Sequence, residues 1–321
     1  MSVRVRVPAT SSNLGAGFDC VGIALDLEGW LTATVSFEAR GDGLVIHRGG
    51  RLSVLTLAPE EDLLARGFYG ACAAAGRPAP TDVTIDAVSD IPVGYGLGSS
   101  AAAIVAGALL ADAALGLGLA RERIVAIAAG VEGHADNVAP AVYGGAVLSV
   151  PTPTGLRTAG LAVAPDLVFL LAVPPFPSDT RAARAALPAV LPHAEAVLAA
   201  SRAAALVQGL ATGDGELLAA ALNGDVLHVP YRRARIPGYD AVVAAAQAAG
   251  AYGATLSGAG SAILAIAPRE RASAVGAALL AAWRETGVDA ELVRCSQLAG
   301  GATVDGTPRP TPHARLTTHN A

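Results

Sequence analysis

Lysine is absent from this chain of 321 residues, and all 22 of its basic residues are arginine. Its absence excludes a Walker A phosphate loop, a lysine Schiff base and a lysine general base. Any cationic contact to an anionic ligand must therefore come from arginine, histidine, a metal ion or the dipoles of the backbone.

Cysteine, aromatic residues and long apolar runs are also scarce. Cys20, Cys72 and Cys295 lie far apart, which favours neither a zinc site nor a disulfide framework and fits a reducing compartment. Aromatic residues make up 4% of the chain and the net charge is −5, which does not indicate a nucleic-acid surface. The best apolar stretch, residues 101–111, stops at Asp112, far short of the roughly 20 residues that a transmembrane helix needs. Because the amino terminus also lacks an apolar signal core, we expect a cytoplasmic protein without nucleic-acid or membrane partners.

Hydrophobic residues make up 53% of the chain and charged residues 15%, so we expect a sizeable core, and the length suggests roughly two domains. Alternating or β-branched segments predict strands, and segments with acidic starts and glycine ends predict helices. The expected strands include residues 3–8, 31–40, 81–88 and 166–174, and the expected helices include residues 59–76, 99–115 and 120–132. This irregular order indicates an α+β protein rather than a doubly wound sheet.

Residues 92–103, PVGYGLGSSAAA, place three glycines at alternate positions between an expected strand and an expected helix. Glycines let backbone N–H groups approach a phosphate closely, and a helix N-terminus adds partial positive charge and unpaired donors. Ser99 and Ser100 are placed to cap the helix and to reach a phosphate or its magnesium ion. The segment matches neither the dinucleotide fingerprint, nor Walker A, nor the G-x-S-x-G elbow of hydrolases, so the glycines alone leave a plain connecting turn open.

The whole segment resembles the P-x-x-x-G-L-G-S-S-A signature of the GHMP kinase superfamily, whose phosphate loop does not depend on a lysine. The resemblance implies that the phosphates of ATP bind at this loop and at the first helical turn. The residues that it assigns to the loop are Pro92, Val93, Gly94, Tyr95, Gly96, Leu97, Gly98, Ser99, Ser100, Ala101 and Ala102.

Near the amino terminus, the segment VPATSSNLGAGFDCVGIAL contains Asn13 and Asp19 on either side of a glycine-bearing turn. Taken alone, both side chains are as well explained by hydrogen bonds to local backbone groups in a loop. The segment resembles the amino-terminal motif of the homoserine kinase family within the superfamily. The resemblance implies that Asn13 lies near the homoserine hydroxyl and that Asp19 binds the homoserine ammonium group.

The segment EGHADNVAPAVYGG begins with Glu132 at the end of an expected helix, where a carboxylate opposes the helix dipole unless a cation is bound. An exposed acid at a fraying helix end is the alternative. The segment resembles a homoserine kinase motif, which implies that Glu132 and Ser100 bind magnesium and that Asn137 lies near the transferred phosphoryl group. His134 and Asp136 are expected to be structural or to support the residues that contact the ligands. The implied catalytic residues are Asn13, Glu132 and Asn137.

Two arginines stand in segments that resemble further motifs of the homoserine kinase family. Arg184 lies in SDTRAARAALP and Arg232 in LHVPYRRARIPG, where Val229 replaces the common glutamate. The resemblance implies that Arg184 and Arg232 clamp the homoserine carboxylate, a task that suits the planar fork of a guanidinium group. Arg233 and Arg235 are expected to face solvent.

A second glycine-rich turn, GATLSGAGSAILAI, resembles the third motif of the superfamily and is expected to approach the phosphate loop from between two strands. The residues of this turn that the resemblance singles out are Ser257, Gly258 and Gly260. Ser261 stands where a proline is common, which leaves the rigidity of the turn open.

Together these segments imply the two-domain GHMP kinase fold. Residues 1–155 are expected to form an ATP-binding domain like ribosomal protein S5 domain 2, and residues 156–300 a ferredoxin-like C-terminal domain. A disordered tail is expected over residues 301–321, and the protein is expected to be a homodimer. The implied reaction is the phosphorylation of L-homoserine to O-phospho-L-homoserine in threonine biosynthesis, with ATP and Mg²⁺ as cofactors.

The residues also bear on the mechanism. Because lysine is absent and Asn137 accepts no proton at neutral pH, we expect positioning and charge stabilisation to replace a strong catalytic base. Three alternatives stay open: another superfamily kinase acting on mevalonate, shikimate or a sugar; a non-catalytic nucleotide-binding protein; and a serine hydrolase using Ser99 or Ser100, for which no convincing order of histidine and aspartate is found.

Overall fold

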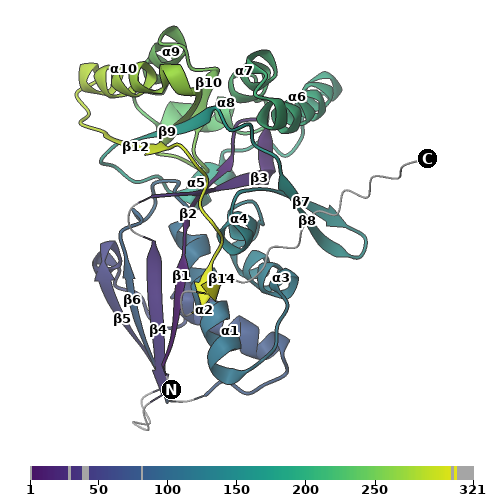
Figure 1. Ribbon diagram of the computed structural model, residues 1–321, viewed down its shortest axis with the longest axis vertical. Coiled ribbons are helices and arrows are strands. Elements are labelled where there is room, and N and C mark those ends of the chain that lie inside the picture. The colour runs from purple at the N-terminus through teal and green to yellow at the C-terminus, as the bar shows by residue number, and fades with distance from the viewer. Residues whose placement is uncertain (1, 28–29, 38–42, 81, 305–306, 309–321) are drawn as a thin grey trace.

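The computed structural model describes residues 2–27, 30–37, 43–80, 82–304 and 307–308. Within these residues the chain forms three β-sheets that follow one another along the long axis of the molecule (Figure 1). The first sheet and its helices occupy the lower half of this view, the middle sheet crosses the centre, and the third sheet lies under the helices at the top.

The first sheet contains the strands with the clearest alternation of apolar and polar residues, β1, β4 and β6. Its order is β14-β13-β1-β4-β6-β5, and every neighbouring pair is antiparallel except the parallel pair of β5 and β6. In β1 the alternation places three valines in the core and two arginines outside. The bounds are β1 Val3–Val7, β4 Leu31–Phe37, β5 Gly43–Gly50, β6 Asp82–Ser89, β13 Thr303–Val304 and β14 Thr307–Pro308.

The carboxyl-terminal segment differs from the predicted disordered tail. β13 pairs with β1 through Val304 opposite Val5 and Thr303 opposite Arg6. β-Branched residues suit an extended strand, and β1 offers them an edge for hydrogen bonding. Strands β13 and β14 therefore belong to the first sheet, while residues 305–306 and 309–321 of the predicted tail lie outside the described residues.

Helix α2 lies on the first sheet, and α1 and α3 pack against α2. α2 is buried along most of its length because its many alanines let neighbouring elements approach closely. The predicted helices are confirmed here; the first begins later than predicted because Asp62 caps it by accepting a hydrogen bond from the Leu64 N–H. The bounds are α1 Leu63–Ala74, α2 Ser99–Leu115, α3 Arg121–Glu132 and α4 Val138–Tyr143.

The middle sheet contains two hairpins and has the order β2-β3-β7-β8. Its strands are β2 Ala9–Asn13, β3 Gly17–Leu25, β7 Ala146–Thr152 and β8 Gly155–Leu161. The predicted domain boundary after residue 155 falls inside the hairpin of β7 and β8, where Thr152 pairs with Gly155. The sheet is not interrupted here, because β7 and β8 pair all the way to Thr152 and Gly155.

The third sheet is antiparallel and has the order β10-β11-β9-β12. Counted along the chain from β9, this is the order 2-3-1-4 of a ferredoxin-like sheet, as predicted for the second domain. Its strands are β9 Leu167–Val173, β10 Gly253–Leu256, β11 Ile263–Pro268 and β12 Glu291–Cys295, and its covering helices are α9 Tyr239–Ala248 and α10 Ala272–Glu285.

Strand β9 separates two hydrophobic cores and is buried on both faces. Phe169 and Leu171 point into the core shared with the first two sheets, whereas Val168 and Leu170 point into the core under α9 and α10. A continuous apolar run is the pattern expected of such a strand. The connecting helices are α5 Thr180–Ala185, α6 His193–Thr212, α7 Gly215–Asn223 and α8 Val229–Arg232.

Candidate active site

The first glycine-rich segment forms the loop between β6 and α2. Gly94, Gly96 and Gly98 have φ angles of 87°, 79° and 69°, a left-handed backbone that other residues rarely adopt. Gly98 is the N-cap, so Ser99 and Ser100 lie in the first helical turn, and the capping role predicted for them is wrong. The loop thus leads into the positive end of a 17-residue helix.

Strand β2 and the second glycine-rich turn, residues 257–260, contact the phosphate loop through hydrogen bonds. The Thr10 N–H donates to the Leu97 carbonyl oxygen at 3.1 Å, and the Ser257 hydroxyl donates to the Gly96 carbonyl oxygen at 2.6 Å. A Cβ atom at Gly96 would collide with the Ser257 carbonyl oxygen. The two glycine-rich turns are therefore in direct contact, although about 160 residues separate them in the sequence.

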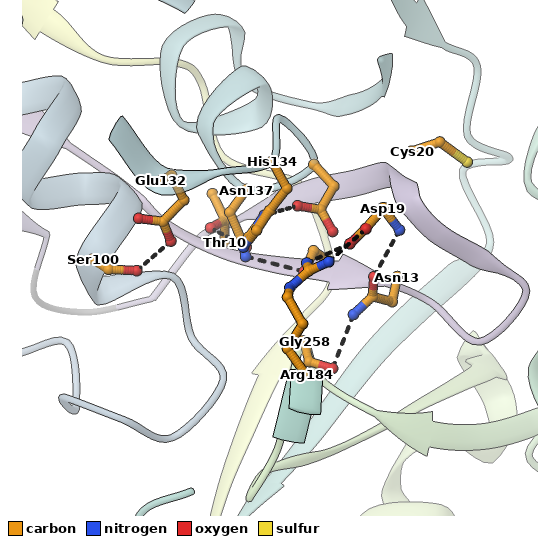
Figure 2. Close-up of polar contacts among 12 residues, drawn as sticks. Thr10, Asn13, Asp19, Cys20, Ser100, Glu132, His134, Asn137, Arg184 and Gly258 are labelled. Atoms are coloured by element: carbon orange, nitrogen blue, oxygen red, sulfur yellow. Dashed lines mark hydrogen bonds and ion pairs between the residues drawn. The ribbon is translucent and has the colours of Figure 1, made fainter. Parts of the chain in front are cut away.

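Ser100 and Glu132 meet beside the N-terminus of α2. The Ser100 hydroxyl donates to Glu132 Oε1 at 2.5 Å (Figure 2). Mg²⁺ prefers oxygen ligands and is usually bound by one or two carboxylates together with substrate phosphates and water. This hydroxyl and carboxylate, placed next to the phosphate loop, therefore fit a magnesium ion.

Asn137 precedes α4 and is oriented through both atoms of its amide group. Thr10 Oγ1 donates to Asn137 Oδ1 at 2.8 Å, and Asn137 Nδ2 donates to Ser12 Oγ at 3.0 Å (Figure 2). Asn137 lines the cleft beside the phosphate loop. Because an amide accepts no proton at neutral pH, this fixed side chain cannot act as a general base.

Two predicted site residues flank the turn between β2 and β3 and have left-handed backbone. Asn13 and Asp19 have φ angles of 74° and 57°, which are uncommon outside glycine and cluster at functional sites. Asn13 Oδ1 accepts a hydrogen bond from the Asp19 N–H at 3.0 Å, and Asn13 Nδ2 donates to the Gly258 carbonyl oxygen at 2.9 Å (Figure 2). The second of these bonds joins the end of β2 to the second glycine-rich turn, residues 257–260.

Asp19 forms an ion pair with Arg184 of α5. Nη1 and Nη2 of Arg184 donate to the two carboxylate oxygens of Asp19 at 2.9 and 2.8 Å (Figure 2). Burial raises the pKa of Asp19, but the hydrogen bond and charge of Arg184 outweigh it and hold the pKa below its ordinary value. The two side chains keep 35% and 43% of their surface exposed, so the pair is accessible to a ligand in the cleft.

Arg232 at the end of α8 lies close to the same place but is only 3% exposed. Its Cζ atom lies 5.2 Å from the centre of the Phe18 ring, and that of Arg184 lies 5.8 Å from it. Burial lowers the pKa of Arg232, and the charge of Arg184 lowers it further. The structure thus brings the two arginines of the predicted clamp together on one aromatic ring. Arg233 and Arg235 are exposed, as predicted.

His134 and Asp136 lie in the cleft, which the sequence analysis did not anticipate. His134 Nδ1 is 2.5 Å from Asp136 Oδ1. Asp19, His134 and Asp136 each place one atom that could bind a metal within 4.8 Å of the other two. Burial lowers the pKa of His134, but the hydrogen bond and charge of Asp136 outweigh it and raise the pKa overall. Their position in one short motif with Asn137 is the sequence signal that could have located them.

A cleft of about 290 Å³ connects the phosphate loop with these polar groups. The cleft is also lined by Val93 of the loop and by aliphatic side chains that the motifs did not include: Ile46, Leu52, Leu55 and Leu57. They come from β5, the segment before α1 and the loop itself, where no regular periodicity marks them. An apolar recess next to a phosphate loop suits the flat faces of a nucleobase.

Comparison with known proteins places the chain in a family. Models of the GHMP kinases N terminal domain and the GHMP kinases C terminal domain match residues 64–145 and 205–285. Homoserine kinase of Nostoc punctiforme is 40% identical over 301 residues, which cover 94% of this chain and 97% of the relative. The chain belongs to the homoserine kinase family. Homoserine kinase of Gloeobacter violaceus is 43% identical over 288 residues, which cover 87% of this chain and 92% of the relative.

Solved structures agree with membership of the homoserine kinase family. The crystal structure of homoserine kinase from Cytophaga hutchinsonii has a TM-score of 0.84 and 29% identity, covering 94% of this chain and 97% of that one. L. major mevalonate kinase has a TM-score of 0.65 at 17% identity, covers 90% of this chain and 94% of its own, and shares the fold alone. The predicted two-domain GHMP kinase fold is therefore confirmed.

None of the described helices has both the length and the apolar character needed to cross a membrane.

Proposed function

We propose that this protein transfers the γ-phosphoryl group of ATP to the side-chain hydroxyl of L-homoserine, giving ADP and O-phospho-L-homoserine for threonine biosynthesis. The observation that carries the proposal is a single cleft that joins a lysine-free phosphate loop to an accessible pair of opposite charges, Asp19 and Arg184. Membership of the homoserine kinase family supports the choice of substrate.

The nucleotide occupies the half of the cleft that contains the loop. Backbone N–H groups of residues 94–98 and the N-terminus of α2 offer donors and partial positive charge to the phosphates. Ser100 and Glu132 would hold Mg²⁺, which would supply positive charge to the phosphates. The base lies in the apolar recess next to the loop.

The amino acid occupies the half of the cleft that contains the ion pair. Its ammonium group binds Asp19, and its carboxylate binds Arg184 and Arg232, which lie on the same Phe18 ring. A zwitterion leaves neither partner of the pair without an opposite charge, whereas mevalonate, shikimate and sugars lack the ammonium group. The charge arrangement therefore favours an amino acid over the acceptors of other GHMP kinases.

The reaction proceeds without a strong general base. Asn13 and Asn137 orient the hydroxyl in line with the γ-phosphorus, and the hydroxyl proton passes to a phosphate oxygen. His134 pairs with Asp136, and this pairing stabilises the protonated form of His134, which accepts no further proton. Phosphoryl transfer has a loose transition state, so positioning and charge stabilisation supply most of its acceleration.

A coupled assay of ADP release with homoserine, shikimate, mevalonate and galactose tests this function. We expect turnover with homoserine alone. Turnover with another acceptor would identify a different GHMP kinase, and no ADP release with any acceptor would identify a non-catalytic nucleotide-binding protein.

We also propose that the protein is a cytoplasmic homodimer; light scattering after size exclusion would measure twice the 31.8 kDa of one chain.

A further inference from the structure

His228 has no role in the mechanism above, yet it is completely buried next to the cleft. It lies immediately before α8, where Asp225 accepts hydrogen bonds from the N–H groups of His228 and Val229 at 2.9 and 2.6 Å. Its ring links two distant segments, because Nε2 is 3.1 Å from the Gly15 carbonyl oxygen in the β2–β3 turn and Nδ1 is 3.3 Å from Nη1 of Arg232.

These two contacts define which ring nitrogen of His228 carries the proton. A carbonyl oxygen only accepts, so Nε2 is the donor toward Gly15, and a guanidinium only donates, so Nδ1 is the acceptor toward Arg232. Burial lowers the pKa of His228 to about 4, which keeps the ring neutral at physiological pH. The ring therefore presents a neutral acceptor to a buried guanidinium group.

The hydrogen bonds of Arg232 account for only part of its donors. Nε donates to the Ala183 carbonyl oxygen at 3.3 Å, and Nη1 donates to His228 and to the Gly258 carbonyl oxygen at 3.4 Å. Within the part of the chain that the structure describes, Nη2 has no hydrogen-bond acceptor, and Arg232 lines the cleft. One side of the guanidinium is thus held by the protein, and Nη2 remains available to an anion.

Phe18 fixes the plane of the His228 ring. The two rings are stacked with centroids 5.1 Å apart and an interplanar angle of 20°. The guanidinium groups of Arg232 and Arg184 lie near the same Phe18 ring. The stack therefore sets the position of the Nδ1 acceptor relative to the clamp.

We propose that His228 is a positioning residue for homoserine binding: its Nδ1 holds the Arg232 guanidinium so that Nη2 meets the substrate carboxylate. The inference rests on the proposed function. His228 acts through Arg232 and does not touch the substrate, so its removal should weaken the contact to the carboxylate and leave the nucleotide half of the cleft unchanged.

Two substitutions separate this role from a structural one. His228→Phe keeps a ring to stack on Phe18 but removes the acceptor, and we expect it to raise KM for homoserine roughly tenfold with KM for ATP unchanged. His228→Asn places a carbonyl oxygen near the position of Nδ1 and should recover part of this loss. His193→Phe, at the exposed start of α6, is the matched control and should change neither constant.

A double-mutant cycle decides the proposal. In the Arg232→Ala background, His228→Phe should have little further effect on KM for homoserine, because the group that it positions is gone. With 3-aminopropan-1-ol, which is homoserine without its carboxylate, His228→Phe should not change kcat/KM. If 3-aminopropan-1-ol is not turned over, His228→Phe should not change its inhibition constant against homoserine.

Three results would overturn the positioning role: additive effects of the two substitutions, equal losses with homoserine and 3-aminopropan-1-ol, or no recovery by His228→Asn in a variant with a native circular dichroism spectrum. If His228→Phe fails to fold, the loss that remains in His228→Asn is compared between homoserine and 3-aminopropan-1-ol. A loss with homoserine alone supports the positioning role, and an equal loss with both overturns it. Absence of homoserine turnover by the wild-type protein would instead contradict the proposed function.

Discussion

The ion pair of Arg184 and Asp19 allows a sharp test of the substrate site, because its removal should affect binding far more than folding. Arg184→Ala deletes both hydrogen bonds to the Asp19 carboxylate and the contact with the Phe18 ring. The variant thus removes one of the two guanidinium groups that we assign to the homoserine carboxylate and leaves the phosphate loop intact.

The expected magnitudes follow from exposure. The side chains of Arg184 and Asp19 are 43% and 35% exposed, and exposed ion pairs contribute about 0–1 kcal/mol to the free energy of unfolding. A hydrogen bond to a charged group contributes about 1.5–3 kcal/mol, which corresponds to roughly 10- to 150-fold in an equilibrium constant. We therefore expect KM for homoserine to rise by this factor, while the free energy of unfolding falls by at most about 1 kcal/mol.

Coupled ADP-release kinetics with either substrate varied would measure both Michaelis constants, and urea denaturation would measure stability. Arg181→Ala is the matched control, since Arg181 is an exposed arginine one turn earlier on the same helix, α5. The control should change KM for homoserine by less than about twofold.

An equal rise of KM for ATP and for homoserine in Arg184→Ala would refute this reasoning, because the arginine would then support the whole cleft rather than the carboxylate contact. A loss of stability of several kcal/mol would refute the use of exposure to judge its contribution to folding.

The remaining predictions concern the metal, the base and pH. Glu132→Gln and Ser100→Ala should each lower kcat by about 100-fold or more and raise the Mg²⁺ concentration needed for activity, with little change in KM for homoserine; an unchanged Mg²⁺ titration would contradict their role. Asn137→Ala should keep measurable turnover, and a pH–rate profile of the wild type with a steep basic limb near neutrality would contradict a mechanism without a base. The raised pKa of His134 means that its charged pair with Asp136 stabilises the folded state below the unfolded-state pKa of about 6.5, and that this contribution is lost as pH rises through the folded-state pKa. The difference in free energy of unfolding between wild type and His134→Gln should therefore be larger at pH 6 than at pH 8.5, and urea denaturation at both pH values would reveal an equal difference if the pair did not form.

Local sequence patterns were sufficient for the elements that carry the phosphate loop. Helix α2 has the predicted limits, residues 99–115, because a run of alanines with high helix propensity is bounded by Gly98 and Gly116 in the left-handed conformation. β9 was predicted from its apolar run, and burial on both faces explains why no polar residue interrupts it.

Local patterns failed where a distant strand decided the outcome. Thr303 and Val304 lie in a polar, proline-bearing segment that reads as disordered, and they form a strand only because β1 provides an edge about 300 residues earlier in the chain. The predicted domain boundary after residue 155 follows a turn, and the pairing of β7 with β8 makes that turn part of a hairpin. Hydrogen-bonding partners of this kind leave no periodic signal in the segment itself.

The site shows the same division. Asn13, Asp19, Glu132 and Asn137 were singled out because each stands in a segment that resembles a homoserine kinase motif, and the structure brings them together in one cleft. The aliphatic residues Ile46, Leu52, Leu55 and Leu57 of the cleft escaped notice, because they come from separate segments that share no motif.

The sequence by itself determined that no lysine binds the phosphates, so their contacts must come from arginine, histidine, a metal ion or the dipoles of the backbone. Only the tertiary structure decided which side chains complete the site: that Asp19 meets Arg184 across 165 residues, and that His228 presents its neutral Nδ1 to Arg232. The physical reason is that composition is fixed in the chain, whereas ion pairs, protonation states and donor directions depend on burial and neighbours that exist only once the sheets have packed.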